Sequence, residues 1–266
     1  MKAIVCVKQV PDTQGKVAVK ADGTMDRAAM ATITNPDDLN AVEAALQLKD
    51  ETGCEVVVVT MGPPPAEGML RELMARGADR GVLVSGREFG GSDTFATSQI
   101  LAAAVNKIGV GPEDIVFCGR QAIDGDTAQV GPQIAEKLHL PQVTYVTEIK
   151  KDGNSLTVKR QLEDGYMELK VQTPCLLTCI KELNTPRYMS VPGIFECYSK
   201  PLTILDFEAL KDEPLIELDT IGLKGSPTNI FKSFTPPQKG VGVMLEGADK
   251  ATAADLADRL LKKHVI

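Results

Sequence analysis

The chain contains no tryptophan, only two histidines, and few aromatic residues, which supply 4% of its 266 positions. With only His139 and His264 available, the second of them at the end of the chain, acid–base catalysis by histidine is not expected. The hydrolase motifs GxSxG and HExxH are also missing. We therefore expect no catalytic side chain, and any chemistry should be carried by a bound cofactor.

Long apolar runs are missing too. No stretch approaches the roughly 18 apolar residues of a membrane span, so no membrane insertion is expected. The apolar run at the N-terminus is too short for a signal peptide and leads into "PDTQG" rather than a cleavage site, which predicts a cytoplasmic protein. A formal net charge of −7 argues against a nucleic-acid partner, because phosphate contacts need a basic face.

The six cysteines form no CxxC pair. Cys175 and Cys179 share one face of a strand-like segment, at a spacing that suits metal coordination poorly. The cysteines inside apolar runs are expected to behave as small buried apolar side chains. We predict neither a metal site nor a disulfide.

The first 140 residues alternate between short apolar runs, typical of buried strands, and amphipathic helical patterns. The strand patterns cover 3–7, 55–61, 80–85 and 114–118, and the helical patterns cover 35–51, 66–78, 92–108 and 126–138. This alternation predicts an α/β fold with an open parallel sheet and helices on both faces, of the nucleotide-binding, flavodoxin or adenine-nucleotide-hydrolase type. Such sheets bind ligands where the strands end and the helices begin.

The period changes to two after Pro141, where Asp-Gly pairs at 152–153 and 164–165 separate three runs that are each expected to form one strand, over 143–150, 155–162 and 166–180. The pattern predicts a small antiparallel extension from about residue 143, completing a nucleotide-binding domain over 1–183. Residues 184–266 are rich in proline and regain helical spacing only at 250–264. They are predicted to form an extended arm whose terminal helix packs on another protein, or alternatively a meander packed on the first domain.

Four polar loops should meet at the ligand-binding edge: "KQVPDTQG", "TMGPPP", "SGREFGGSDT" and "GRQAIDGDTAQ". Neither a P-loop nor a GxGxxG after the first strand is present. A nucleotide would therefore have to use backbone N–H groups at helix N-termini. Gly90 and Gly91 would let the backbone approach an anion, and Gly125 could supply a turn of positive φ. The alternative is that these are ordinary loops, with Ser92 or Asp93, and Asp126 or Thr127, as helix caps. Asn35 is likewise expected to cap the helix over 35–51.

Several segments together resemble the β subunits of electron-transfer flavoproteins. They are "VCVKQVPD", "NPDDLNAVEAALQLK", "MGPPPAEGMLRELMARGADRG", "GRQAIDGDTAQVGPQIAEKL", "KRQLEDGYMELKVQTPCLLT" and "LNTPRYMSVPGI". These segments cover nearly the whole chain in the family's order, so together they are specific although each alone would be weak.

The resemblance implies a heterodimer with a larger α subunit that holds an FAD. One type of β subunit binds a structural AMP, whereas the electron-bifurcating type binds a second FAD and oxidises NADH there. The stretch "VSGREFGGSDTFATS" resembles the bifurcating type. One electron would then pass to ferredoxin or flavodoxin, and the other through the α-subunit FAD to an acyl-CoA dehydrogenase. The alternatives are a non-bifurcating subunit with AMP, or a stand-alone nucleotide-binding sensor module.

The resemblance also implies sites. The nucleotide contacts would be Cys6, Asn35, Pro36, Asp37, Asp38, Met61, Gln121, Ala122, Ile123, Asp124, Gly125, Asp126, Thr127, Ala128, Gln129, Val130, Gly131 and Pro132. The loop serving NADH and the β-subunit flavin would contribute Phe89, Gly90, Gly91, Asp93 and Thr94. A recognition loop for the dehydrogenase would contain Pro186, Arg187, Tyr188, Val191, Pro192 and Ile194. Asp124 and Asp126 would bind ribose or cap a helix rather than transfer protons.

Overall fold

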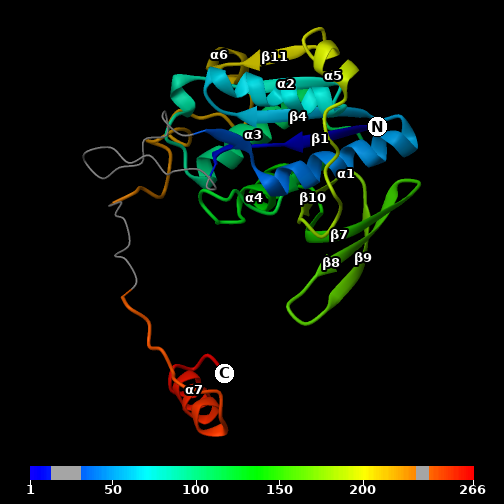
Figure 1. Cartoon of the computed structure of the whole chain (residues 1–266). Coiled ribbons are helices and arrows are strands. Elements are labelled where there is room, and N and C mark those ends of the chain that lie inside the picture. Colours follow the sequence, from blue (N-terminus) through cyan, green and yellow to red (C-terminus); the bar gives the residue numbers. More distant parts are fainter. Residues whose placement is uncertain (13–30, 232–239) are drawn as a thin grey trace.

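The computed structural model describes residues 1–12, 31–231 and 240–266. Its main sheet has nine strands in the order β11-β5-β4-β1-β6-β10-β7-β8-β9 (Figure 1). The four predicted central strands are present as β1 (Lys2–Cys6), β4 (Glu55–Met61), β5 (Arg80–Val84) and β6 (Ile115–Gly119), all parallel to their neighbours. The open parallel α/β fold is therefore confirmed. Part of the loop "KQVPDTQG" lies outside the described residues.

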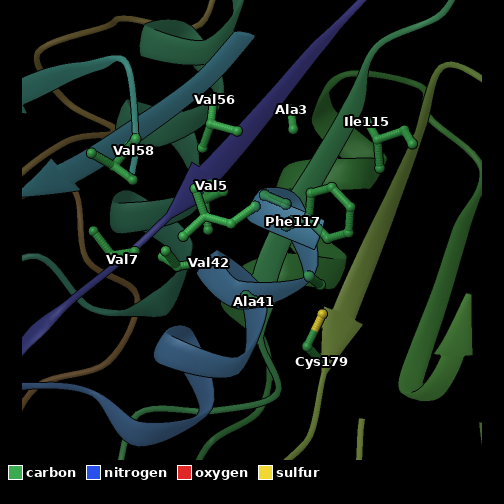
Figure 2. Packing of buried hydrophobic residues seen from close by; sticks show 14 of the residues in the cluster. Ala3, Val5, Val7, Ala41, Val42, Val56, Val58, Ile115, Phe117 and Cys179 are labelled. Carbon is green, nitrogen blue, oxygen red and sulfur yellow. The ribbon is translucent and has the colours of Figure 1, made fainter. Parts of the chain in front are cut away.

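Helices cover both faces of the parallel sheet. Helices α1 (Pro36–Thr52) and α2 (Glu67–Arg76) share one core with alternate strand residues such as Val5 and Val58. Figure 2 shows Val5, Val58 and Phe117 beside Ala41 and Val42 of α1. Helices α3 (Thr94–Ile108) and α4 (Val130–Lys137) share the opposite core with the intervening strand residues. The two-residue period of a strand explains why every central strand contributes to both cores.

The antiparallel extension is formed by β7 (Gln142–Asp152), β8 (Ser155–Gln161) and β9 (Tyr166–Gln172). The first Asp-Gly pair places Gly153 at φ 55°, which glycine adopts without the clash that a side chain would cause. The predicted hairpins are therefore present, at the far edge of the sheet from β11.

One prediction about this region is wrong. The run from Tyr166 to Ile180 was expected to be a single strand of the extension, but the chain turns at Thr173–Pro174. Strand β10 (Cys175–Cys179) instead lies between β6 and β7 and runs parallel to both. The reason is burial: every residue of β10 is buried, as expected of a central parallel strand, whereas β9 is mostly exposed.

The sequence did not predict β11 (Leu202–Leu205), which pairs with β5 at the sheet edge. Helix α5 (Val191–Glu196) packs on α2, and helix α6 (Phe207–Leu210) packs on α3. Leu210 and Ile221 are buried in the core that α3 and α4 share with the sheet. A meander packed on the first domain thus describes this part of 184–266. By contrast, α7 (Lys250–Lys262) has no buried residue and stands away from the body in Figure 1.

The remaining elements are short. Strands β2 (Gln9–Pro11) and β3 (Thr32–Thr34) form an antiparallel pair after β1, and single helical turns η2 (Pro64–Ala66) and η3 (Arg87–Phe89) precede α2 and α3. Within the described ranges, no helix has the length and apolar character needed to cross a membrane.

Candidate functional site

The sheet has a topological switch point between β1 and β6. These strands are neighbours, but the chain leaves β1 toward β4 and leaves β6 toward β7, in opposite directions along the sheet. Open α/β sheets usually bind their ligands in a crevice beyond the carboxyl ends of two strands whose connections diverge in this way, and this position is called the crevice below. The start of α1 and the loop Arg120–Gln129 border this crevice.

Asp38, in the first turn of α1, ties the two strand ends together. Its Oδ2 accepts a hydrogen bond from the Lys8 backbone N–H at 2.8 Å, and its Oδ1 accepts one from the Gly119 N–H at 3.0 Å. Burial raises the pKa of Asp38 to about 7, although both hydrogen bonds favour the ionised form. Asp38 is thus a structural carboxylate that fixes the floor of the crevice.

Gly119 is needed where β6 meets the start of α1. A Cβ at this position would lie 2.7 Å from the Asp37 carbonyl carbon and 2.7 Å from the Asp38 nitrogen, and would also collide with Asp38 Oδ1. Only glycine allows so close an approach between strand and helix. The sequence analysis missed Gly119, although a glycine ending a buried strand was a usable signal.

Asn35 was considered a helix cap, and it does occupy the N-cap position of α1, but its side chain makes no capping hydrogen bond. The fully buried side chain reaches across the crevice instead. Its Nδ2 donates to the Gln121 carbonyl at 2.7 Å, and its Oδ1 accepts from the Ile123 N–H at 3.1 Å. Asn35 therefore holds the loop after β6 against α1.

The loop after β6 differs from its predicted form. Gly125 does not have a positive φ, whereas Asp126 and Ala128 do, at 51° and 52°. Helix α4 begins only at Val130, so neither Asp126 nor Thr127 caps it, and Gln129 at the N-cap provides no side-chain cap. Asp126 instead accepts a hydrogen bond from Gln121 Nε2 at 2.7 Å. The N–H groups of Val130 and Gly131 at the start of α4 are thus left without a side-chain cap, an arrangement that suits an anionic group, whereas Pro132 has no N–H to donate.

Lys8 and Asp124 close the loop from the β1 side. Lys8 Nζ lies 2.7 and 2.9 Å from the two carboxylate oxygens of Asp124. The Lys8 side chain is about half exposed, at 49%, so the pair should stabilise the protein little. Asp124 is therefore engaged by a lysine, a partner that the sequence analysis did not identify.

Replacing Lys8 with methionine is expected to loosen the loop 121–129 while lowering the free energy of unfolding by less than about 1 kcal/mol. Hydrogen exchange should become faster in this loop, because the ion pair with Asp124 is lost. Lys262→Met, which removes the exposed pair of Lys262 with Asp258 on α7, is the matched control. Unchanged exchange at 121–129 in Lys8→Met would show that the pair does not restrain the loop.

The predicted site residues in the loop between β5 and α3 mainly contact other parts of this chain. Phe89 is buried in the core, and a Cβ on Gly91, whose φ is +76°, would lie 2.9 Å from Leu223 Cβ. Internal packing thus accounts for this glycine. Thr94 Oγ1 lies 3.1 Å from Gln129 Oε1, so this loop meets the loop after β6.

Asp93 caps α3 as predicted, because its Oδ1 accepts from the Ala96 N–H at 3.1 Å. Its Oδ2 also accepts from the N–H and the hydroxyl of Thr228, at 2.9 and 2.7 Å. Burial would raise the pKa of Asp93, but the hydrogen bonds from Thr228 and Ala96 lower it. The chain segment that leads into the C-terminal arm is thus attached to the start of α3.

The residues expected to contact a nucleotide lie along one edge of the sheet, the one formed by the carboxyl ends of the parallel strands. Cys6 ends β1, Met61 ends β4, and Gly131 lies in the first turn of α4, where a Cβ would come within 2.9 Å of Thr178 Cγ2. The structure brings the following predicted residues to this edge: Cys6, Asn35, Pro36, Asp37, Asp38, Met61, Gln121, Ala122, Ile123, Asp124, Gly125, Asp126, Thr127, Ala128, Gln129, Val130, Gly131 and Pro132. These residues thus lie at the carboxyl ends of the parallel strands, where open α/β sheets bind their ligands.

A cavity of about 560 Å³ lies on the other side of the start of α1. Asp37 and Arg120 line it, with Oδ2 and Nε 3.2 Å apart, and burial raises the pKa of Asp37. Arg160 and Tyr145 line the same cavity. The Nε atom of Arg160 is buried without a hydrogen-bond acceptor, whereas that of Arg120 has the Asp37 carboxylate beside it. Asp37 therefore faces this cavity, whereas Asp38 faces the floor of the crevice.

All six cysteines are free thiols and buried. In the part of the chain that the structure describes, no group of histidine, cysteine, aspartate and glutamate side chains is arranged to hold a metal ion.

The predicted recognition residues divide into two sets. Tyr188, Val191 and Ile194 are exposed, at 91%, 70% and 43%. Arg187 instead turns back onto α1, where it pairs with Glu43 and Asp50. The structure adds Phe195 and Tyr198, exposed at 77% and 74%, which the sequence analysis missed. These five exposed side chains all lie between residues 188 and 198, and they are called the docking surface below.

Comparison with known proteins identifies similar chains. Residues 22–210 match the family described as "Electron transfer flavoprotein domain". Over 100% of both chains, the sequence is 72% identical to the acryloyl-CoA reductase electron transfer subunit gamma of Anaerotignum propionicum. With the same full coverage, it is 53% identical to the caffeyl-CoA reductase-Etf complex subunit CarD of Acetobacterium woodii, and 48% identical to the electron transfer flavoprotein subunit beta of Clostridium acetobutylicum.

Proposed function

The chain belongs to the electron transfer flavoprotein family as an electron-transfer subunit, and we propose that it is the β subunit of an electron-bifurcating heterodimer. In this proposal, the start of α4 and the loop after β6 would hold an FAD at the β1/β6 crevice. The group would supply oxidation of NADH, and its acceptors would be ferredoxin or flavodoxin and, through the FAD of the α subunit, an acyl-CoA dehydrogenase.

The observation that carries the nucleotide proposal is the uncapped start of α4 at the switch-point crevice. The first-turn N–H groups and the positive end of the helix dipole would bind the phosphates of FAD. Asn35 would keep the loop 121–123 in position for the rest of the nucleotide. These residues fit the group because the uncapped start of α4 offers backbone donors to its phosphates.

A bound FAD would supply both the exchange of two electrons with NADH and the one-electron steps toward the acceptors. The protein would bind, orient and shield it. Asp38 and Gly119 would keep the crevice floor rigid. Asp124, paired with Lys8, and Asp126, bonded to Gln121, are oriented by these contacts, which favours hydrogen bonding to ribose over proton transfer.

Two observations support the bifurcating type over a subunit with structural AMP. The chain has 72% and 53% identity to subunits whose names place them with acryloyl-CoA reductase and caffeyl-CoA reductase. The contact between Thr94 and Gln129 joins the "FGGSDT" loop to the crevice, so a longer nucleotide could reach both loops. The enoyl-CoA chemistry in those names also favours an acyl-CoA dehydrogenase as the protein that meets the docking surface.

The C-terminal segment supports a permanent partner. Helix α7 has no buried residue although Leu256 and Leu261 are apolar, and Val265, just after the helix, is exposed as well. Phe231, Val241 and Met244, on the chain leading to it, are exposed at 100%, 104% and 87%. Exposed apolar residues of this extent mark an interaction site, and we assign it to the α subunit. A stand-alone sensor module would leave these side chains in water.

The test is to co-express the chain with the α subunit and to count cofactors in the purified heterodimer. We expect two FAD per heterodimer and full bleaching of flavin absorbance on anaerobic titration with NADH. One FAD with one AMP, and no reduction by NADH, would contradict the bifurcating type and establish the AMP-binding alternative. A stable monomer without flavin absorbance would favour the sensor module.

A further inference from the structure

Helix α1 carries buried polar residues beyond the crevice. Asn40 and Glu43 are each only 5% exposed, and neither contacts the nucleotide loops. Both contact the segment that precedes α5. We propose that Asn40 and Glu43 are positioning residues, which fix the docking surface relative to the nucleotide crevice. This inference rests on the proposed role of the docking surface.

Asn40 and Asn184 form a reciprocal pair. Asn40 Nδ2 lies 2.9 Å from the Asn184 carbonyl oxygen and 3.1 Å from its Oδ1, and Asn184 Nδ2 donates to the Asn40 carbonyl at 3.0 Å. The contacts involve the backbone carbonyls of both residues. They therefore fix the path of the chain at residue 184, not only the two side chains.

Glu43 and Arg187 form the stronger anchor. The Arg187 backbone N–H donates to Glu43 Oε2 at 3.0 Å, while its Nε and one terminal nitrogen donate to the two carboxylate oxygens at 2.9 and 3.0 Å. This is the bidentate fork that arginine makes with a carboxylate, and it constrains orientation as well as distance. The Glu43 side chain is 6% exposed, so water competes little for the contact. Arg76 adds a hydrogen bond to the Arg187 carbonyl at 2.6 Å.

The far end of the docking surface is fixed on α2. Gly193 leaves no room for a Cβ against the Ala75 carbonyl oxygen. Arg71 donates to the Cys197 carbonyl at 2.8 Å, and Lys200 Nζ donates to the Met74 and Ala78 carbonyls at 2.9 and 2.8 Å. The exposed residues between 188 and 198 are thus held at both ends while their side chains point into solvent.

Helix α1 links the docking surface to the crevice. Asp38 at the crevice and Glu43 at the anchor lie on one helix, about 7.5 Å apart along its axis at 1.5 Å per residue. The docking surface therefore cannot shift freely relative to the crevice. A segment already ordered before binding also avoids the entropy cost of ordering when the partner arrives. The two anchors should accordingly affect the affinity for the partner more than the chemistry at the crevice.

The test uses Glu43→Gln in the complete heterodimer, with the acyl-CoA dehydrogenase as the varied substrate. We expect its KM to rise about tenfold, because one buried charged partner of Arg187 is lost, while kcat and flavin reduction by NADH stay unchanged. Hydrogen exchange at residues 184–198 should become faster. Arg187→Lys, which keeps the charge but loses the bidentate fork, should change KM in the same direction and provides the test if Glu43→Gln does not fold.

Asp50→Asn is the matched control, since Asp50 contacts the same arginine at 2.7 Å but is 61% exposed, and it should change KM less than twofold. A Phe195→Ser, Val191→Ser variant separates this inference from the proposed function. If that variant leaves KM unchanged, the docking surface itself is assigned wrongly. If it raises KM while Glu43→Gln and Arg187→Lys change neither KM nor exchange, the positioning inference is overturned.

Discussion

Gly119→Ala is expected to lower the free energy of unfolding by about 3 kcal/mol or more, and to abolish nucleotide binding. The new methyl group would meet the backbone of Asp37 and Asp38, with both the Asp37 carbonyl carbon and the Asp38 nitrogen only 2.7 Å away. Backbone atoms inside a helix cannot rotate away as a flexible side chain can. The start of α1 would therefore have to move off β6, which opens the crevice floor. Denaturant unfolding and the nucleotide content of the purified heterodimer measure the two effects.

Gly125→Ala is the matched control for this prediction. Gly125 lies in the neighbouring loop, has no positive φ, and has no atom within 4 Å of the position that a Cβ would occupy. We expect stability within about 0.5 kcal/mol of the unsubstituted protein. Equal effects of the two substitutions would mean that contact with α1 is not what requires a glycine at position 119.

Asp38→Ala should also have a large effect, a loss of roughly 2–6 kcal/mol in the free energy of unfolding. The substitution leaves two strand-end N–H groups, those of Lys8 and Gly119, without their acceptor in a buried place. Each buried donor without an acceptor costs about 1–3 kcal/mol. Asp38→Asn keeps one acceptor oxygen, so its loss should be about half as large. Retention of full stability by Asp38→Ala would show that water or a shifted side chain replaces the carboxylate.

The same residue predicts a pH dependence. Burial raises the pKa of Asp38 from 3.8 to about 7 in the folded protein. Between pH 4 and pH 7 the folded state therefore holds a proton that the unfolded state has lost, so stability falls as pH rises through this window and levels off above it. Each pKa unit corresponds to about 1.4 kcal/mol.

Asp38→Asn has no group that titrates at this position, so the difference between the two proteins isolates the contribution of Asp38 from that of Asp37, whose pKa burial also raises. Free energies of unfolding measured for both proteins from pH 4.5 to pH 8 should converge as pH rises. Parallel curves would mean that Asp38 is ionised throughout, with its two backbone hydrogen bonds outweighing burial.

The sequence predicted which segments come together at the candidate site, but not the polar contacts that hold them there. It placed Asn35, Asp38 and the loop 121–132 together, because parallel strands bring successive loops to one edge. It assigned capping roles to Asn35 and Asp126 that the structure does not show, since each side chain has a more distant partner. It also treated Arg187 as a partner contact, whereas the arginine is turned onto Glu43. In each case a polar residue had a plausible local role, and a contact formed by the fold replaced it.

The parallel α/β core and the two hairpins of the extension could be predicted from the residues alone. Those features depend on local signals, namely apolar runs, helical spacing and Asp-Gly turns, which act over a few residues. The position of β10 inside the parallel sheet and of β11 at its edge could not, because strand order depends on which apolar runs can be buried on both faces of the folded sheet. The polar contacts of the site also depend on the folded chain. Asp38 meets Gly119 across 81 positions and Glu43 meets Arg187 across 144, and no local pattern encodes a partner at that distance.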